Sequence, residues 1–405
     1  MKKPDRILSP EFLSLSAVMF LTFCNLAVFF QFDAYLGTLG FGKELSGFLI
    51  GVFSLAVLVV RPIISPFLHE GNARFWIIVS SCGIIVCLLM YDLGTTPWRM
   101  SAIRTAHGLA YVVLATASLS ILVAHIPPGK SAQAFGILSV LTLLPYAVIP
   151  PLLNPLGAFL GGFTRVLDVF GLAMVLVFPL MPFFGGRSKK NVVQEDAGIA
   201  WNDLLGNLRD ARIILLMLAS LLVWAAFTVV FFYLKGYGEK VNVGNAGWFF
   251  TLSTFSEIGV RLIAGPLLDR YDKSRFLTVA SLWLAASYFV MVYISGETAF
   301  HAMGIIFGLG WGITMPMLSG LVFDISEPKL RALNTNLSME MFQAGYFLGP
   351  LAGGVILIHW GYGALFFASG AVMIVAAICA GLLTKVKVPR ASTPGRGVPG
   401  RGETQ

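Results

Sequence analysis

The sequence predicts an all-α membrane protein with 12 transmembrane helices in two pseudo-symmetric six-helix halves. Three observations support this fold class: the composition, a series of long apolar segments and an internal repeat. Of the 405 residues, 57% are hydrophobic and only 12% are charged, whereas soluble globular proteins carry about 25% charged residues. This composition excludes a soluble domain, a disordered chain and a disulfide scaffold, and it leaves an integral membrane protein.

Twelve segments are long and apolar enough to span a bilayer, which takes about 20 residues of helix. In chain order they cover residues 12–36, 44–68, 75–93, 98–124, 132–153, 164–184, 211–234, 245–268, 275–295, 299–323, 334–358 and 361–385. The first begins after a basic stretch, as a signal peptide does, but its apolar run is longer than that of a cleavable signal. We therefore expect an uncleaved first transmembrane helix.

Lysine and arginine are distributed unequally between the two sides of these spans. Of 28 in total, 20 fall on the side that holds both termini. The opposite loops contain five, namely Lys43, Arg99, Arg165, Lys235 and Lys240. Because cytoplasmic loops are enriched in these residues, both termini are expected in the cytoplasm. The same bias accounts for the formal net charge of +8, so no nucleic-acid partner is expected.

Residues 200 positions apart match without gaps over two stretches of the chain. The identical pairs are Gly47/Gly247, Val60/Val260, Arg61/Arg261, Ile63/Ile263, Pro66/Pro266, Leu68/Leu268, Gly108/Gly308, Leu109/Leu309, Pro128/Pro328 and Pro150/Pro350. This shared register indicates two homologous halves. An even number of spans in each half gives the halves the same orientation in the membrane.

Four parts of the chain follow from this pattern: a six-helix half at 1–185, a cytoplasmic linker at 186–210, a second half at 211–387 and a tail at 388–405. The linker ends in a stretch whose apolar residues would share one helical face. This stretch is either a short interfacial helix or an ordinary charged loop. The tail is rich in proline, glycine and arginine, and it is expected to be disordered.

Three motifs resemble those of a known transporter family. Residues 265–275 read Gly-Pro-Leu-Leu-Asp-Arg-Tyr-Asp-Lys-Ser-Arg, the fourth span contains Arg104-Thr-Ala-His107-Gly108, and the eleventh contains Gly345-Tyr-Phe-Leu-Gly349-Pro350-Leu-Ala-Gly353-Gly354. Together with the repeat, they resemble the major facilitator superfamily (MFS), and the sequence is most similar to its bacterial drug and sugar efflux-type permeases. The resemblance implies the MFS fold and a monomer in the bacterial inner membrane. It also implies transport of a small organic solute by alternating access.

Two departures from the family pattern bear on the direction of transport. The first-half copy of the loop motif reads Ser65-Pro-Phe-Leu-His69, and the fifth span has Pro150-Pro151 without the glycines expected of antiporters. The resemblance favours a proton-coupled exporter, and these departures leave uptake by proton symport as the alternative. A non-transporting membrane sensor is a more remote one. The sequence has no nucleotide-binding loop and no metal-ligand spacing, so neither an enzyme nor a cofactor nor a metal is expected.

Charged residues inside the spans cost roughly 2.5–3.5 kcal/mol each on insertion scales, so each needs a function or a partner. The candidates for proton coupling are Asp33, Arg104, Glu257 and Glu340. Asp33 is the leading one, unless the first span ends early and exposes it to water outside. Glu257 could instead form a structural ion pair with Arg261, one helical turn later. Arg104 could hold a substrate anion, and the resemblance implies that it tunes a proton-carrying carboxylate.

Six polar or aromatic residues are candidates for the substrate cavity: Asn25, Phe29, His107, Trp311, Asn336 and Gln343. The first two share a stripe of the first span with Asp33, and the last two share a face with Glu340. A polar stripe on a membrane helix must face protein or water. Each residue could instead belong to the core or bond to a neighbouring helix.

The loop motif contributes one further expectation. The resemblance implies that Asp269, Arg270 and Arg275 form a gating latch that is broken and remade as access alternates. A solvated basic loop is the alternative.

Overall fold

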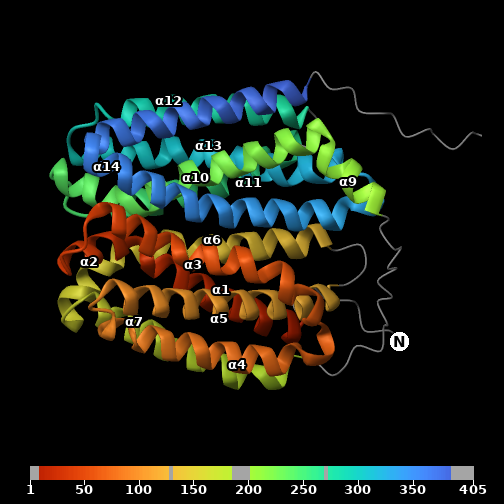
Figure 1. Ribbon diagram of the computed structural model, residues 1–405, viewed down its shortest axis with the longest axis horizontal. Coiled ribbons are helices and arrows are strands. Elements are labelled where there is room, and N and C mark those ends of the chain that lie inside the picture. Colours follow the sequence, from red (N-terminus) through yellow and green to blue (C-terminus); the bar gives the residue numbers. More distant parts are fainter. Residues whose placement is uncertain (1–8, 127–130, 185–200, 269–271, 385–405) are drawn as a thin grey trace, which may run out of the picture.

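The computed structural model describes residues 9–126, 131–184, 201–268 and 272–384, and within these ranges it is helical and contains no strand (Figure 1). Ten helical segments are long and apolar enough to cross a membrane. The longest of them contains the last two predicted spans, and α11 (Gly247–Leu268) corresponds to the eighth. The structure therefore confirms the predicted all-helical fold class with its 12 spans.

The first six predicted spans form one bundle. The first span consists of α1 (Pro10–Ala27), η1 (Val28–Gln31) and α2 (Phe32–Thr38). The next four are α3 (Lys43–Ile64), α4 (Glu70–Leu89), α5 (Pro97–Ala124) and α6 (Ser131–Leu160). The sixth consists of α7 (Phe163–Ala173), η4 (Met174–Leu176), α8 (Val177–Leu180) and η5 (Met181–Phe183). Short 3-10 turns η2 (Ser65–Phe67) and η3 (Tyr91–Leu93) follow α3 and α4. We call this bundle the N half.

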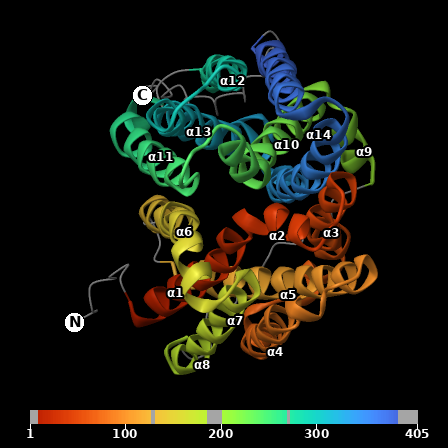
Figure 2. The same ribbon diagram turned by 90° about the vertical axis from the view of Figure 1, so that its left-hand side faces the viewer.

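The remaining spans form a second bundle, the C half. Besides α11 it contains α10 (Ala211–Lys240), α12 (Lys273–Met291), α13 (Glu297–Ile325), η6 (Pro328–Leu330) and α14 (Arg331–Leu383). Helix α14 comprises two spans, because Gly361 breaks it with a φ of 75° and a ψ of −175°. A positive φ is easy only for glycine, which has no β-carbon. Figure 2 shows the two bundles side by side, α1–α8 in one and α10–α14 in the other.

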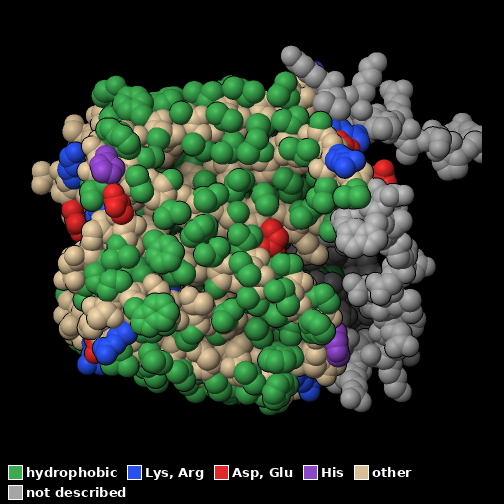
Figure 3. Space-filling view, in the orientation of Figure 1, with side chains coloured by type: hydrophobic (Ala, Val, Ile, Leu, Met, Phe, Trp, Pro, Cys, Tyr) green, Lys and Arg blue, Asp and Glu red, His purple; other side chains and the backbone are tan. Residues whose placement is uncertain are grey.

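The two ends of the molecule differ. Helix α9 (Trp201–Arg209) lies at one end, on the right in Figure 1, together with the starts of α10 and α14; we call this the linker end. The opposite, far end holds the short connections 39–42, 94–96, 161–162, 241–246 and 292–296. Hydrophobic side chains cover most of the face between the two ends, and charged ones gather near the ends (Figure 3). This distribution fits a bilayer around the middle of the bundle.

Helix α9 forms where the sequence allows either a short helix or a charged loop. It is fixed to α14 by a buried amide pair, in which Asn207 and Asn334 donate to each other at 2.7 and 3.0 Å. Asp210 then caps α10 by accepting from the Arg212 backbone at 2.8 Å. Hydrogen bonds from the Arg212 side chain lower the pKa of Asp210. The rest of the predicted linker up to residue 200 and the predicted tail at 388–405 lie outside the described residues.

The repeat register reappears in the packing inside each half. A β-carbon at Gly108 on α5 would lie 2.5 Å from the carbonyl oxygen of Phe53 on α3. In the C half, a β-carbon at Gly308 on α13 would overlap the carbonyl of Ser253 on α11. Residues 53 and 253 are themselves 200 positions apart. The repeated glycines therefore let equivalent pairs of helices touch backbone to backbone.

The same register governs how the two halves meet. A β-carbon at Gly47 on α3 would overlap the Pro350 carbonyl on α14, and one at Gly247 on α11 would overlap the backbone of Pro150 on α6. Hydrogen bonds add to the second contact, since Thr251 donates to the Ala147 carbonyl at 2.6 Å. All these residues lie toward the far end. The far end is therefore closed by two pseudo-symmetric backbone contacts, α3 with α14 and α6 with α11.

Candidate functional site

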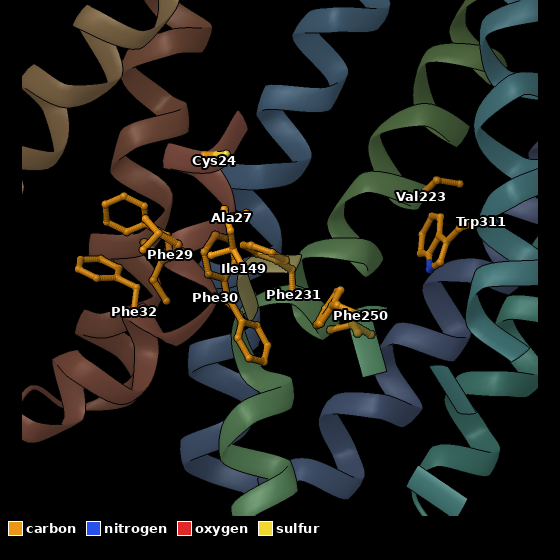
Figure 4. Packing of buried hydrophobic residues seen from close by; sticks show 14 of the residues in the cluster. Cys24, Ala27, Phe29, Phe30, Phe32, Ile149, Val223, Phe231, Phe250 and Trp311 are labelled. Atoms are coloured by element: carbon orange, nitrogen blue, oxygen red, sulfur yellow. The ribbon is translucent and has the colours of Figure 1, made fainter. Parts of the chain in front are cut away.

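Aromatic side chains fill the middle of the molecule between the two halves. In Figure 4, Phe30 of the N half reaches toward Phe231 and Phe250 of the C half, and its ring centroid lies 6.2 and 5.2 Å from theirs. Closer to the linker end, Tyr146 on α6 lies 5.5 Å from Phe231 of the C half between ring centroids, and Tyr346 lies on α14. These tyrosines are again 200 positions apart. Equivalent positions of the two halves therefore carry a tyrosine.

The rings around this tyrosine pair come mainly from the C half. Phe342 lies 4.5 Å from Tyr346 between ring centroids, and Trp224 lies 4.5 Å from Phe342. On the N-half side, Tyr146 contacts Phe23 at 6.5 Å. Rings of this kind bury a large apolar area and present flat faces to a ligand. The middle of the molecule could therefore hold a ring-containing solute.

Two opposite charges face each other across the halves on the linker side of the tyrosines. Arg61 lies on α3 and Glu340 on α14, and the guanidinium acts electrostatically on the carboxylate. They form neither a hydrogen bond nor an ion pair in the described part of the chain, and Arg61 Nη1 and Glu340 Oε2 are both buried without a partner there. Charges inside a membrane protein are normally paired. This pair is therefore the most conspicuous unfilled polar feature between the halves.

The pseudo-symmetric position carries a completed contact. Arg261 on α11 pairs with Glu257 on the same helix and also donates to Ser139 Oγ on α6, in the other half. The ion pair that the sequence allows between Glu257 and Arg261 is thus formed. Glu257 is buried. Together these residues link α11 to α6 between the far-end contact and the linker end.

Asp33, the leading coupling candidate, lies in the closed far end. Its Oδ2 accepts from Lys43 Nζ at 2.5 Å, and its Oδ1 is buried without a partner among the described residues. The backbone carbonyl of Lys43 in turn faces Gly354 of the C half, where a β-carbon would overlap it. Asp33 lies near the end of its span, but the carboxylate is buried and not exposed to water.

Replacing Lys43 with glutamine is expected to destabilise the protein more than replacing Asp33 with asparagine. The first change leaves a buried carboxylate unpaired, which costs about 3–5 kcal/mol. The second leaves an ammonium whose side chain is 32% exposed and can reach water, at a cost of about 1 kcal/mol. The unfolding temperature of the purified protein in detergent measures the difference.

A matched control is Arg165→Gln in the exposed Arg165–Asp168 pair, which spans 3.0 Å and should change stability by less than about 0.5 kcal/mol. Equal losses for Lys43→Gln and Asp33→Asn would contradict the buried placement of Asp33.

Arg104 lies inside the N half. Its Nε and Nη2 donate to the backbone carbonyls of Leu49 and Ile50 at 3.2 and 2.8 Å, and Nη1 donates to the Tyr91 hydroxyl at 3.4 Å. Three rings surround the guanidinium, with centroids 4.7–4.8 Å from Cζ; they belong to Phe29, Phe32 and Phe53. No carboxylate pairs with it in the described ranges. Arg104 therefore fastens α5 to α3 and to η1.

The other predicted cavity residues are scattered. His107 is buried in the N half, with Nδ1 at 3.1 Å from the Tyr91 hydroxyl. Asn25 is buried on α1 and donates to the Leu21 carbonyl at 3.0 Å. Trp311 packs at 5.1 Å against Phe227 inside the C half. On α14, Asn336 is exposed and Gln343 is buried. Phe29 and His107 are thus brought together with Arg104, and the others are not.

The predicted gating latch is described only in part. Asp269 and Arg270 lie outside the described residues. Arg275 is exposed and pairs with Asp272 at 3.6 Å, within the first turn of α12. The latch stays a prediction.

The residues that sequence reasoning missed carry a signal that it used elsewhere. Tyr146 and Tyr346 obey the 200-residue register, so a complete search of the repeat would have found them. Arg61 also belongs to the repeat, but the repeat alone does not mark it as a residue between the halves. Lys43 was counted as a loop residue, and nothing in the sequence marks it as the partner of Asp33.

The chain matches the family model of the Major Facilitator Superfamily over residues 12–244 and 240–401. It is 23% identical to the MFS-type transporter YuxJ of Bacillus subtilis over 93% of this chain and 96% of that one. It is 22% identical to the multi-drug resistance efflux pump PmrA of Streptococcus pneumoniae (86% and 90% covered) and 21% identical to the multidrug resistance protein MdtG of Klebsiella pneumoniae (87% and 86% covered).

Solved structures show the same fold. The nucleoside transporter NupG superposes with a TM-score of 0.74 at 16% identity, covering 93% of this chain and 99% of NupG. A bacterial homologue of the lysosomal transporter Spinster, in an inward-facing and unoccupied conformation, gives 0.72 at 14% identity, covering 95% and 96%. With both halves matched by the family model, this chain is an integral, multi-pass membrane protein that belongs to the major facilitator superfamily of transporters.

Proposed function

We propose that the protein is a secondary active transporter that exports a small, ring-containing organic solute in exchange for protons, by alternating access. One observation carries the proposal. The two halves touch backbone to backbone at the far end, whereas an unpaired arginine and an unpaired glutamate face each other between the halves on the linker side. This asymmetry fits one of the two access states of a rocking transporter.

The orientation follows from the excess of lysine and arginine at the linker end. That end, both termini and the linker are proposed to face the cytoplasm of a bacterial inner membrane. The closed far end then faces outward. The chain is proposed to work as a monomer, since each half contributes to the site between them.

Export is supported by the names of the relatives, two of which are a multidrug resistance protein and a multi-drug resistance efflux pump. The aromatic surroundings of the tyrosine pair suit solutes of this kind. Uptake by proton symport is the second candidate. It is favoured by the α6 sequence, where Pro150 and Pro151 replace the glycines expected of antiporters and pack against Gly247.

Glu340 is the proposed coupling carboxylate, because one of its oxygens has no partner in the described part of the chain. A free carboxylate between the halves can hold either a proton or a positively charged part of the solute. Occupation by one excludes the other, which is what exchange requires. Glu257 is held by Arg261, and Asp33 by Lys43, so both are less available for this role.

Purified protein in liposomes with a trapped pH dye tests the proposal. A panel of cationic drugs, sugars and small acids is added, and proton movement is recorded for wild type, Asp33→Asn, Glu257→Gln and Glu340→Gln. We expect one solute class to drive protons in the direction opposite to its own movement. Glu340→Gln should lower this proton flux by about 100-fold, the usual range for losing a proton-transfer group. Asp168→Asn, in an exposed pair at the far end, should behave as wild type.

Protons that move in the same direction as the solute would establish symport instead. Solute movement without any proton movement would overturn proton coupling. No movement of any solute under any ion gradient would overturn the transporter itself.

A further inference from the structure

The region between the halves has one positive and one negative side chain, here called the two walls: Arg61 in the N half and Glu340 in the C half. Arg61 is on α3 in the N half and Glu340 is on α14 in the C half, so each half supplies one sign. Neither has a hydrogen bond or an ion pair to any residue in the described ranges, and each keeps a buried atom without a partner, Nη1 and Oε2. An unpaired buried charge is costly. A ligand that neutralises only one wall leaves the other uncompensated.

Aromatic residues of both halves lie on the far-end side of these charges. Tyr111 on α5 packs against Phe53 on α3 at 5.3 Å, and Tyr346 packs against Phe342 at 4.5 Å between ring centroids. Tyr146 of the N half packs against Phe231 of the C half, with 5.5 Å between ring centroids. The region between the halves therefore offers a cation, an anion and phenol rings.

We propose that Arg61 and Tyr146 of the N half and Glu340 and Tyr346 of the C half together bind a zwitterion with an aromatic ring. The positive group of the ligand lies on Glu340, the negative group on Arg61, and the ring against the tyrosines. The inference rests on the proposed transport function and adds the charge class of the solute.

Electrostatics exclude the two simpler classes. A cationic ring would satisfy Glu340 but would be repelled by Arg61, and an anionic ring would meet the reverse problem. Like charges brought together at an interface cost several kcal/mol. Only a ligand that carries both signs neutralises both walls. Because the two walls belong to different halves, the same ligand would also draw the linker end together.

Three dyes with one scaffold test this charge preference. Rhodamine 110 carries a delocalised cation and a carboxylate, rhodamine 123 is its methyl ester and carries only the cation, and fluorescein carries only negative charge. Binding to the full-length protein in detergent is measured by fluorescence anisotropy at neutral pH, with no ion gradient. For wild type we expect rhodamine 110 to bind at least about tenfold more tightly than either of the others.

Substitutions should then redirect the preference in opposite directions. Glu340→Gln should remove the advantage of rhodamine 110 over fluorescein, and Arg61→Gln should remove its advantage over rhodamine 123. The double reversal of Arg61→Glu with Glu340→Arg should restore the preference for rhodamine 110, which also shows that the variants fold. Asp168→Asn keeps the wild-type order as a matched control at the far end.

Three results would overturn the inference. The first is an ester that binds wild type as tightly as rhodamine 110. The second is a pair of variants that weaken all three dyes equally, because Arg61 and Glu340 would then be a latch that closes the linker end without touching the ligand. The third is a wild type that binds none of the dyes.

The transport proposal and the zwitterion proposal can fail independently of each other. Protein that moves rhodamine 123 against protons in liposomes without any preference for rhodamine 110 keeps the transport proposal and loses this one. Protein that prefers rhodamine 110 in detergent but moves no solute under any gradient keeps the zwitterion site and loses the transport proposal.

Discussion

Replacing Gly247 with leucine is expected to open the far end of the molecule and to reduce transport by about 100-fold. The new side chain would collide with the backbone of Pro150 and Pro151 on α6, which has no rotamer to move away. Overpacking of this kind costs about 1–3 kcal/mol, and about 3 kcal/mol shifts an equilibrium between two access states more than 100-fold. Gly47→Leu should act in the same way through the Pro350 carbonyl on α14.

Opening can be measured at a distance from the substitution. Ser46 is fully buried and precedes Gly47, which forms the α3–α14 contact, so a cysteine at position 46 should react with a maleimide only when the far end opens. Of the four natural cysteines only Cys82 is exposed, and a serine there removes the background. Gly247→Leu lies in the other contact, α6 with α11. Fast labelling of Ser46→Cys in the Gly247→Leu variant would therefore report opening of the whole far end.

Matched glycines on the same two helices provide controls. A β-carbon at Gly136 on α6 or at Gly259 on α11 would meet nothing within 4 Å. Leucine at these positions should leave both labelling and transport near wild type. Normal transport by Gly247→Leu, with Ser46→Cys still protected, would contradict a far end that closes by backbone contact.

The internal repeat marked residues that form the contacts between the two halves at the far end. Gly47, Gly247, Pro150 and Pro350 were found as identical pairs in one register, and the structure brings each glycine onto the proline of the opposite half. A position repeated in both halves and needed for a symmetric contact must satisfy the same steric condition twice. Comparing the two halves of the sequence can therefore find such contacts, because the close approach requires the same residue type, glycine, at both positions.

The partners of the buried charges could not be found in this way. Lys43 lies 10 residues after Asp33, beyond a turn, and pairs with it only because α3 starts next to α2. Arg104 bonds to backbone carbonyls, which every residue has, so no residue type marks its acceptors. Helix rotation and tilt decide which side chains meet, and apolar periodicity fixes neither to within one residue. The sequence therefore predicted which positions need partners, but not the partners.

Arg104 gives the sharpest contrast between the sequence-based hypothesis and the geometry. If Arg104 tuned a proton-carrying carboxylate, Arg104→Lys would keep the charge and preserve transport, and Arg104→Met would abolish it. The geometry predicts the reverse order, because the guanidinium fork bonds two carbonyls and the Tyr91 hydroxyl inside a ring of three phenylalanines. Lysine lacks the planar guanidinium, and its ammonium group, which prefers to be strongly hydrated, would lie among the three phenylalanine rings. Methionine fills the same cage without a charge.

We therefore expect Arg104→Lys to lower the free energy of unfolding by about 3 kcal/mol or more, from lost charged hydrogen bonds of about 1.5–3 kcal/mol each. Arg104→Met should cost about half as much, because replacing a buried ion by an apolar group of similar length is often tolerated. Unfolding temperatures and transport rates of both variants decide the order, with Arg99→Met, at an exposed position, as the control. If transport survives in the lysine variant and disappears in the methionine variant, Arg104 takes part in proton coupling. The opposite order would mean that its charge is needed only to hold α3 and α5 together, which leaves the charges between the halves, Arg61 and Glu340 above all, as the groups that meet the solute.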